Sequence, residues 1–212
     1  MPRRTKMRFM SEEEYLQAEE KSSIRHEYVD GCVFAMSGAT DAHNIVCGNI
    51  FAAIYAHVRG TGCRAYINDM KVRIQSQKRY YYPDIMVSCE PFDAKSVIKT
   101  GPCLLIEVLS PSTTQIDKRE KLVAYQKIAS LQEYVIVYQD RQKVELYRRV
   151  SHEHWDVILL RQGEDLVLES LANGHLQLPF DTIYEGYQPP GRVKEDESCY
   201  ETTLQMFDCV DA

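Results

Sequence analysis

Two nearly continuous apolar runs, joined by a helical segment, most constrain what this chain can fold into. The runs are Cys103–Leu109 and Glu133–Tyr138, and helix-forming residues extend between them from about Gln115 to Ala129. An apolar run without alternation is typical of a strand that is buried on both faces. Because a strand, a helix and a second strand at this spacing form a parallel crossover, the sequence predicts an α/β fold in which a mixed sheet carries helices on its faces.

Turn and capping signals divide the rest of the chain into further elements of a single domain. Ser11 and Glu14 form a capping box, which predicts a helix beginning near Glu12. The other predicted elements are strands over Arg25–Val29 and Cys32–Met36 around an Asp30-Gly31 turn, a helix over Asp41–Arg59 with Asp41 as its N-cap, strands over Arg64–Ile74 and Tyr81–Ser88, a strand pair over Val144–Val150 and Trp155–Arg161, and short strands with a final turn over 165–187. We expect one domain over residues 10–187, a flexible basic arm over 1–9 and a loose acidic tail over 188–212.

Composition narrows the class of protein. Of the 212 residues, 44% are apolar, which is enough for a buried core, and no apolar run has the roughly 18–20 residues that a membrane span needs. The formal net charge of −6 argues against coating DNA by bulk electrostatics. None of the seven cysteines is spaced as CxxC, and His152 and His154 have no cysteine at ligand spacing. We therefore expect reduced, buried thiols, no zinc site, a cytoplasmic protein and no membrane partner.

Two carboxylates stand where the predicted strands should be apolar. Glu107 lies inside LLIEVLS, and a charge in a buried strand costs several kcal/mol unless it is paired or bound to a metal. Asp84 follows Pro83, and it stands 23 residues before Glu107. That separation allows the two side chains to meet across adjacent strands, where two hard oxygen ligands would suit Mg²⁺. The structural alternatives are a buried ion pair for Glu107 and a turn or strand-cap role for Asp84.

A lysine near these acids would complete a hydrolytic site. Lys118 and Lys121 both lie within roughly 40° of Tyr125 on the apolar side of the predicted helix, at 100° per residue. Periodicity does not choose between them, and a lysine whose stem covers apolar surface is the alternative for either one.

Several short motifs follow one another along the chain. They are Glu27-Tyr28-Val29-Asp30-Gly31, His43 at the start of the next helix, Asn68–Arg73, Pro83-Asp84, and IEVLSPST (residues 106–113) followed by Asp117, Lys121 and Tyr125. In this order they resemble the Uma-type family of restriction endonucleases, part of the PD-(D/E)xK nuclease superfamily, over about residues 10–187. One position departs from the superfamily pattern, because Leu109 stands where most members have lysine two residues after the acid.

The resemblance implies a restriction-endonuclease-like fold in which the lysine has moved onto the helix, which favours Lys121 over Lys118. It adds Glu27 as a third acid near the metal and places His43 at the mouth of the site. Asp69 would be either a partner of the metal ligands or an outward strand residue.

The implied activity is endonucleolytic hydrolysis of DNA phosphodiester bonds by a possible homodimer. Asp84, Glu107, the Val108 carbonyl and Glu27 would bind Mg²⁺, for which Mn²⁺ can substitute, while Lys121 and His43 would assist catalysis. The basic residues expected to contact the DNA backbone are Lys71, Arg73, Lys78 and Arg79. Three alternatives stay open: a catalytically silent nucleic-acid-binding module on the same fold, a structural protein with ion-paired acids, and a phosphodiesterase that acts on RNA or nucleotides.

Overall fold

A computed structural model of the protein describes residues 9–36, 38–109 and 115–187, with the side chains of the third helix described from Arg119 onward. Its elements are α1 (Glu12–Glu20), β1 (His26–Val29), β2 (Cys32–Ala35), α2 (Asp41–Val58), β3 (Arg64–Ile67), β4 (Lys71–Ile74), β5 (Arg79–Tyr81), β6 (Ile85–Ser88), β7 (Ile98–Lys99), β8 (Pro102–Leu109), α3 (Gln115–Gln126), β9 (Glu133–Tyr138), β10 (Lys143–Arg149), β11 (Trp155–Leu160), β12 (Asp165–Leu168), β13 (Leu176–Pro179) and α4 (Phe180–Ile183). The expected acidic tail and all but the last residue of the expected basic arm lie outside the described residues.

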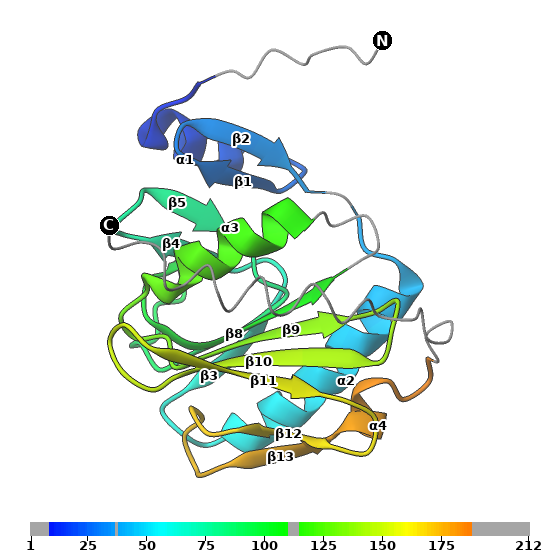
Figure 1. The fold of residues 1–212 in the computed structure, drawn as a ribbon. Helices are drawn as coiled ribbons and strands as arrows, with labels where there is room; N and C mark the ends of the chain where they lie inside the picture. Colours follow the sequence, from blue (N-terminus) through cyan, green and yellow to red (C-terminus); the bar gives the residue numbers. More distant parts are fainter. Residues whose placement is uncertain (1–8, 37, 110–114, 188–212) are drawn as a thin grey trace, which may run out of the picture.

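A mixed sheet of six strands forms the centre of the fold, in the order β11-β10-β9-β8-β6-β3. The predicted crossover is confirmed: β8 and β9 pair in parallel, with Leu104 opposite Glu133, and α3 connects them (Figure 1). The predicted pairing of β10 with β11 is confirmed too, and it is antiparallel. Both apolar runs therefore occupy the middle of the sheet, where each strand has a neighbour on either side.

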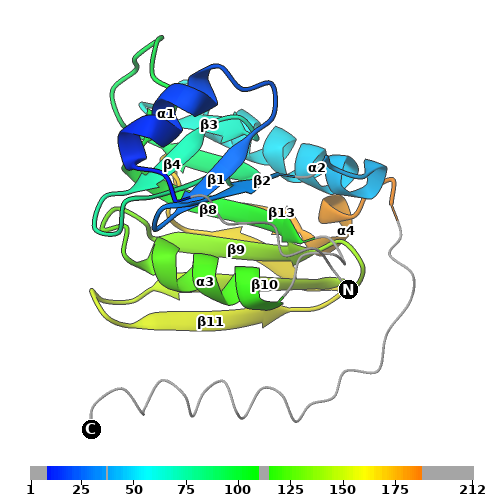
Figure 2. The same ribbon diagram turned by 90° about the horizontal axis from the view of Figure 1, so that it is seen from above.

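The six-stranded sheet is covered on both faces (Figures 1 and 2). Along β8, Leu104, Ile106 and Val108 belong to a core shared with α2, β12, β13 and α4. Leu105 faces the other way, into a core with α3 and strands β4 and β5. Successive side chains of a strand alternate between its faces, so Glu107 points to the α3 side.

The second sheet shows where two predicted strands were wrong. The predicted strands over 64–74 and 81–88 are each interrupted, so that β3 and β6 lie in the central sheet while β4 and β5 lie in a five-stranded sheet of order β2-β1-β5-β4-β7. Asn68 breaks the first run with a φ of 60°. Pro83 separates β5 from β6, since its ring removes a donor that a continuous central strand needs. The chain thus leaves one sheet and enters the other next to Asp84.

The N-terminal hairpin and helices follow their local signals, with one correction. The capping box of Ser11 and Glu14 is present at α1, and the Asp30-Gly31 turn joins β1 to β2 with positive φ at both residues. The expected N-cap of α2 at Asp41 is wrong: the cap is Thr40, whose hydroxyl accepts from the His43 amide at 3.2 Å. Threonine and aspartate are both good caps, so composition alone could not place the boundary to one residue.

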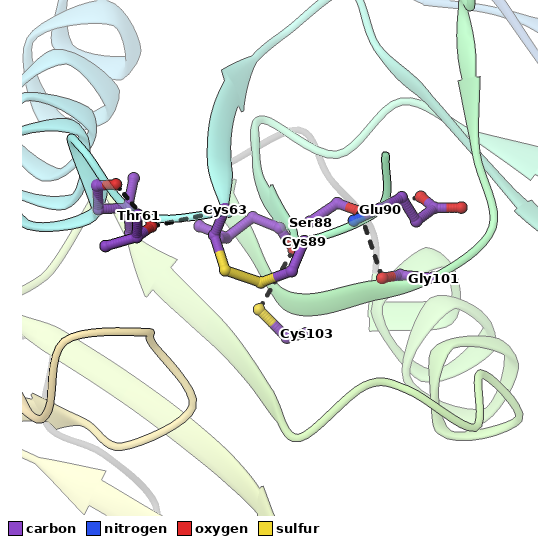
Figure 3. Close-up of a disulfide and its surroundings, with 9 residues drawn as sticks. Thr61, Cys63, Ser88, Cys89, Glu90, Gly101 and Cys103 are labelled. Carbon is purple, nitrogen blue, oxygen red and sulfur yellow. Dashed lines mark hydrogen bonds between the residues drawn. A yellow bond between two sulfur atoms is a disulfide. The ribbon is translucent and has the colours of Figure 1, made fainter. Parts of the chain in front are cut away.

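The expectation of reduced cysteines throughout the chain is also wrong. Cys63 and Cys89 form a disulfide that joins the residue before β3 to the residue after β6 (Figure 3). The two strands pair antiparallel with Arg64 opposite Ser88, and this register brings the cysteines side by side. Sequence spacing does not contain that register. No helix within the described residues is long and apolar enough to cross a membrane.

Candidate active site

Asp84 and Glu107 meet at the junction of β6 and β8. The antiparallel register pairs Ile85 with Ile106, which places the preceding Asp84 opposite Glu107. The Val108 amide donates to Asp84 Oδ2 at 2.7 Å and fixes this carboxylate against β8. Two acids far apart in sequence are therefore held on neighbouring strands, in the arrangement expected from their spacing.

Lys121 reaches these acids from α3. Its Nζ lies 3.2 Å from Glu107 Oε1 and 2.8 Å from Oε1 of Glu27, which comes from β1. Tyr125, one turn further along α3, donates its hydroxyl to the same Oε1 atom of Glu107 at 2.7 Å. The lysine is thus clamped between two carboxylates, while the side chain of Lys118 lies outside the described residues.

His43 approaches from the opposite side of the junction. It lies in the first turn of α2, where Thr40 caps the helix, and its Nε2 is 3.3 Å from Asp84 Oδ2. Cys47 follows one turn later, and its Sγ lies 3.6 Å from His43 Nδ1. The site therefore draws on five separate segments of the chain: β1, α2, the residue before β6, β8 and α3.

Burial and charge perturb the titration of these groups. Burial raises the pKa of Glu107 to about 7, and the charges of Asp84 and Glu27 add to the rise while Lys121 and Tyr125 oppose it. Burial lowers the pKa of Lys121, but the charges of Glu107 and Glu27 outweigh it and raise that pKa above its ordinary value. Burial likewise lowers the pKa of His43, and the hydrogen bond and charge of Asp84 raise it above the ordinary value. Titratable groups perturbed together in a cleft are typical of functional sites.

A cleft of about 920 Å³ opens over the acids. Its floor includes Asp84, Glu107, Val108 and Lys121, and its wall is formed by the β1–β2 hairpin and the segment that leads to α2. The volume is in the range of pockets that hold substrates.

The oxygen atoms in the cleft fit a hard divalent cation. Hydrogen bonds and ion pairs within the described part of the chain involve Oδ2 of Asp84 and Oε1 of Glu107, and none there engages Asp84 Oδ1 or Glu107 Oε2. Val108 follows Glu107 in β8 and lines the cleft, and its carbonyl is a further candidate ligand. Mg²⁺ prefers oxygen ligands of this kind, usually one or two carboxylates together with waters.

The basic residues expected to contact DNA are mostly engaged elsewhere. Lys71 is only 6% exposed, which is incompatible with a phosphate contact on an open strand. Arg73 pairs with Glu12 at 2.7 Å, and Arg79 pairs with an aspartate of the β1–β2 turn. Lys78 is the exposed member of the four. The sequence placed Lys71 and Arg73 in a strand and did not reveal the partners of these basic residues.

Asp69 lies outside the strands. Among the described residues, no direct contact joins it to the acids of the site. It lies between β3 and β4, is highly exposed, and pairs with Arg25 at 3.2 Å on the rim of the cleft. Its side chain therefore belongs to the entrance of the site.

Comparison with known proteins identifies the family. Residues 12–181 match the family model Uma2, described as "Putative restriction endonuclease". The chain belongs to the Uma2 family. Among relatives, it is 34% identical over 178 residues to the uncharacterized protein slr1290 of Synechocystis sp., covering 84% of this chain and 92% of that protein. It is 32% identical over 159 residues to the uncharacterized protein sll1609 of the same organism, covering 74% of this chain and 89% of that protein.

A solved structure shows that the fold of this Uma2 protein is the expected one. The crystal structure of a "putative nuclease belonging to DUF820" from Anabaena variabilis superposes with a TM-score of 0.67 at 18% identity, covering 82% of this chain and 97% of that one. The restriction-endonuclease-like fold is therefore confirmed. Residues 110–114, which include the end of the IEVLSPST motif, lie outside the described residues.

Sequence reasoning about this Uma2 protein missed the contribution of Cys47. Cys47 is one of the thiols expected to be buried, and it stands four residues after His43 in the sequence. That i, i+4 spacing places two side chains on one helix face, and it was the available signal.

Proposed function

We propose that this Uma2 protein is a Mg²⁺-dependent endonuclease that hydrolyses phosphodiester bonds of DNA, with Mn²⁺ able to replace Mg²⁺. The observation that carries the proposal is the convergence of Asp84, Glu107 and Lys121 in one cleft, with an unengaged oxygen on each acid among the described residues. The family description and the nuclease-like fold support it.

Asp84, Glu107 and the Val108 carbonyl are the proposed ligands, with Glu27 as a further acid beside them. The bound ion would polarise the scissile phosphate and lower the pKa of a water molecule. The protein itself positions the substrate and the metal ligands. The shape of the cleft holds the phosphodiester against β8, and the register of β6 and β8 keeps the two acids at fixed separation.

Lys121 orients the attacking water and stabilises the negative charge that develops on the phosphate. Its clamp between Glu27 and Glu107 restricts the ammonium group to one position, so little reorganisation is needed during the reaction. His43 holds a proton next to Asp84, and it either contacts the phosphate or takes part in proton transfer. A symmetric cut of duplex DNA needs two such sites, so a homodimer is part of the proposal.

Replacing Asp84 tests the assignment. Asp84→Asn keeps the shape of the side chain but removes its charge, so Mg²⁺-dependent cleavage of plasmid DNA should fall on the order of 100-fold or more, since the ligand is worth several kcal/mol of transition-state stabilisation. Asp69→Asn is the matched control: it neutralises another aspartate of the same cleft, one that lies at the rim, and should retain activity. Cleavage should be followed with Mg²⁺, with Mn²⁺ and with EDTA.

The same assay separates the alternatives. Wild-type protein that binds duplex DNA but does not cut it would be the silent binding module. Cutting of RNA or nucleotides alone would place the activity with another class of phosphodiesterase. An Asp84→Asn variant as active as wild type would overturn the site.

A further inference from the structure

A second set of metal ligands lies beside the proposed catalytic acids and is of a different chemical kind. His43, Cys47 and Asp84 offer one nitrogen, one sulfur and one oxygen atom that all lie within 4.8 Å of one another. Cys47 is 2% exposed, and the side chains of His43 and Asp84 are 13% and 14% exposed. The three groups are thus largely shielded from solvent at one side of the cleft, which His43 and Asp84 line.

One of the distances between these atoms matches the edge of a tetrahedral site. Zinc bonds of about 2.0–2.3 Å place the ligand atoms of a tetrahedron roughly 3.3–3.6 Å apart. His43 Nε2 lies 3.3 Å from Asp84 Oδ2 and 4.0 Å from Cys47 Sγ. Cys47 Sγ lies within 4.8 Å of the other two ligand atoms and has to move closer to them on binding, and a water molecule can take the fourth position.

We propose that His43, Cys47 and Asp84 form a binding site for a thiophilic divalent cation of the Zn²⁺ class. A thiolate and an imidazole are poor ligands for Mg²⁺ but good ligands for Zn²⁺ and Co²⁺. Binding would release the thiol proton of Cys47 and the proton that His43 holds beside Asp84, as the sulfur and the ring nitrogen form bonds to the metal. The helix supports this geometry, since residues four apart on α2 present their side chains to the same face.

Asp84 belongs to both the proposed Zn²⁺ site and the proposed Mg²⁺ site, so an ion in one site affects binding in the other. An ion held by His43, Cys47 and Asp84 occupies the carboxylate that the proposed Mg²⁺ site requires. Zn²⁺ should therefore inhibit cleavage and compete with Mg²⁺, and this part of the inference rests on the proposed function. Binding itself does not rest on it.

Co²⁺ titration of the full-length protein tests binding directly. A cysteine-bound Co²⁺ ion gives a thiolate charge-transfer absorption that oxygen and nitrogen ligands do not give. Wild-type protein should show this band with one ion per chain, and Cys47→Ala should remove it, with binding weakened on the order of 100-fold. Cys103→Ala is the matched control: it removes another free thiol of the chain, one on β8 whose Sγ donates to the Val87 carbonyl, and should keep the band. Circular dichroism checks that both variants fold. The variant His43→Asn removes a second proposed ligand and should also abolish the band.

The outcomes separate this site from the proposed nuclease. A band that survives in Cys47→Ala, or a wild type without a band, would overturn the second site even if Mg²⁺-dependent cleavage is found. A band lost only in Cys47→Ala and His43→Asn, in a protein that cleaves no nucleic acid, would support the site while the proposed function fails. Where cleavage occurs, Zn²⁺ inhibition is measured for each protein as the Zn²⁺ concentration that halves its own rate with Mg²⁺. This concentration should be about 10-fold higher or more for Cys47→Ala than for the wild type.

Discussion

At the scale of single residues, the surroundings of Glu107 disfavour the ionised form of its carboxyl group. It is buried beside Asp84, and its pKa is raised to about 7 from an ordinary value near 4.5, chiefly by burial. In the unfolded chain the group ionises near 4.5, while in the metal-free folded protein it keeps its proton up to about pH 7. Its contribution to stability is therefore complete below pH 4.5 and is lost as the pH rises to 7.

A pH series of unfolding measurements tests this assignment. In EDTA, the free energy of unfolding of the wild type should fall relative to that of Glu107→Gln between about pH 4.5 and 7, and the difference should be constant above that range. Glutamine is the control because it is neutral at every pH and can still accept from Tyr125. The comparison removes the contributions of the other acids, which the two proteins share. A difference that rises with pH would mean that Lys121 outweighs burial and that the pKa of Glu107 is lowered.

The anomalous acids were the part of the site that could be predicted from sequence. Glu107 stands out because its strand is otherwise apolar, and Asp84 because it interrupts another apolar run. The choice between Lys118 and Lys121 could not be made from helical periodicity, since both lie on the same side of the helix. Lys121 contacts Glu107, and that contact depends on how α3 is packed against β8, while the side chain of Lys118 lies outside the described residues.

At the scale of elements, local signals located most helices and strands but not their division between sheets. The hairpin around Asp30-Gly31 and the crossover from β8 to β9 depend on turn chemistry and hydrophobic runs, which the sequence contains. The alternating run over 64–74 and the apolar run over 81–88 each read as one strand, yet each passes from one sheet to the other. Strands with mostly buried side chains occur in both sheets, so periodicity cannot show where the chain changes sheet.

The start of α2 carries the prediction at this scale, because it positions His43. Thr40 accepts from the His43 amide and donates to Gln139 Oε1 at 3.1 Å, so it links the helix to the residue after β9. Thr40→Ala should lower the free energy of unfolding by about 1–2 kcal/mol. Asp41→Ala removes only a favourable charge in the first turn and should cost about 0.3–1 kcal/mol. Urea unfolding at pH 7 measures both, and a larger loss in Asp41→Ala would return the cap to Asp41.

At the scale of the whole molecule, the candidate site is a product of long-range assembly. Glu27, His43, Asp84, Glu107 and Lys121 come from both sheets and from two helices on opposite faces of the central sheet. No local pattern specifies such a meeting point. The ordered motifs that the chain shares with the Uma2 family indicated this site, because they contain the residues that meet there.

The disulfide closes the far end of the β3–β6 pair and should stabilise the fold without tuning the site. It spans 26 residues, and cross-linking a loop of this length removes enough freedom from the unfolded chain to contribute about 3 kcal/mol. Asp84 precedes β6 whereas Cys89 follows it, so the hydrogen bond from Val108 holds Asp84 at the opposite end of the strand.

The double variant Cys63→Ala/Cys89→Ala should therefore unfold at a lower urea concentration, while its Mn²⁺ affinity, measured by calorimetry, stays near that of the wild type. Dithiothreitol should lower the urea midpoint of the wild type but not that of the double variant. Equal midpoints for the oxidised wild type and the double variant would show that the bond does not stabilise the fold, and a loss of Mn²⁺ affinity would show that the two ends of β6 are coupled.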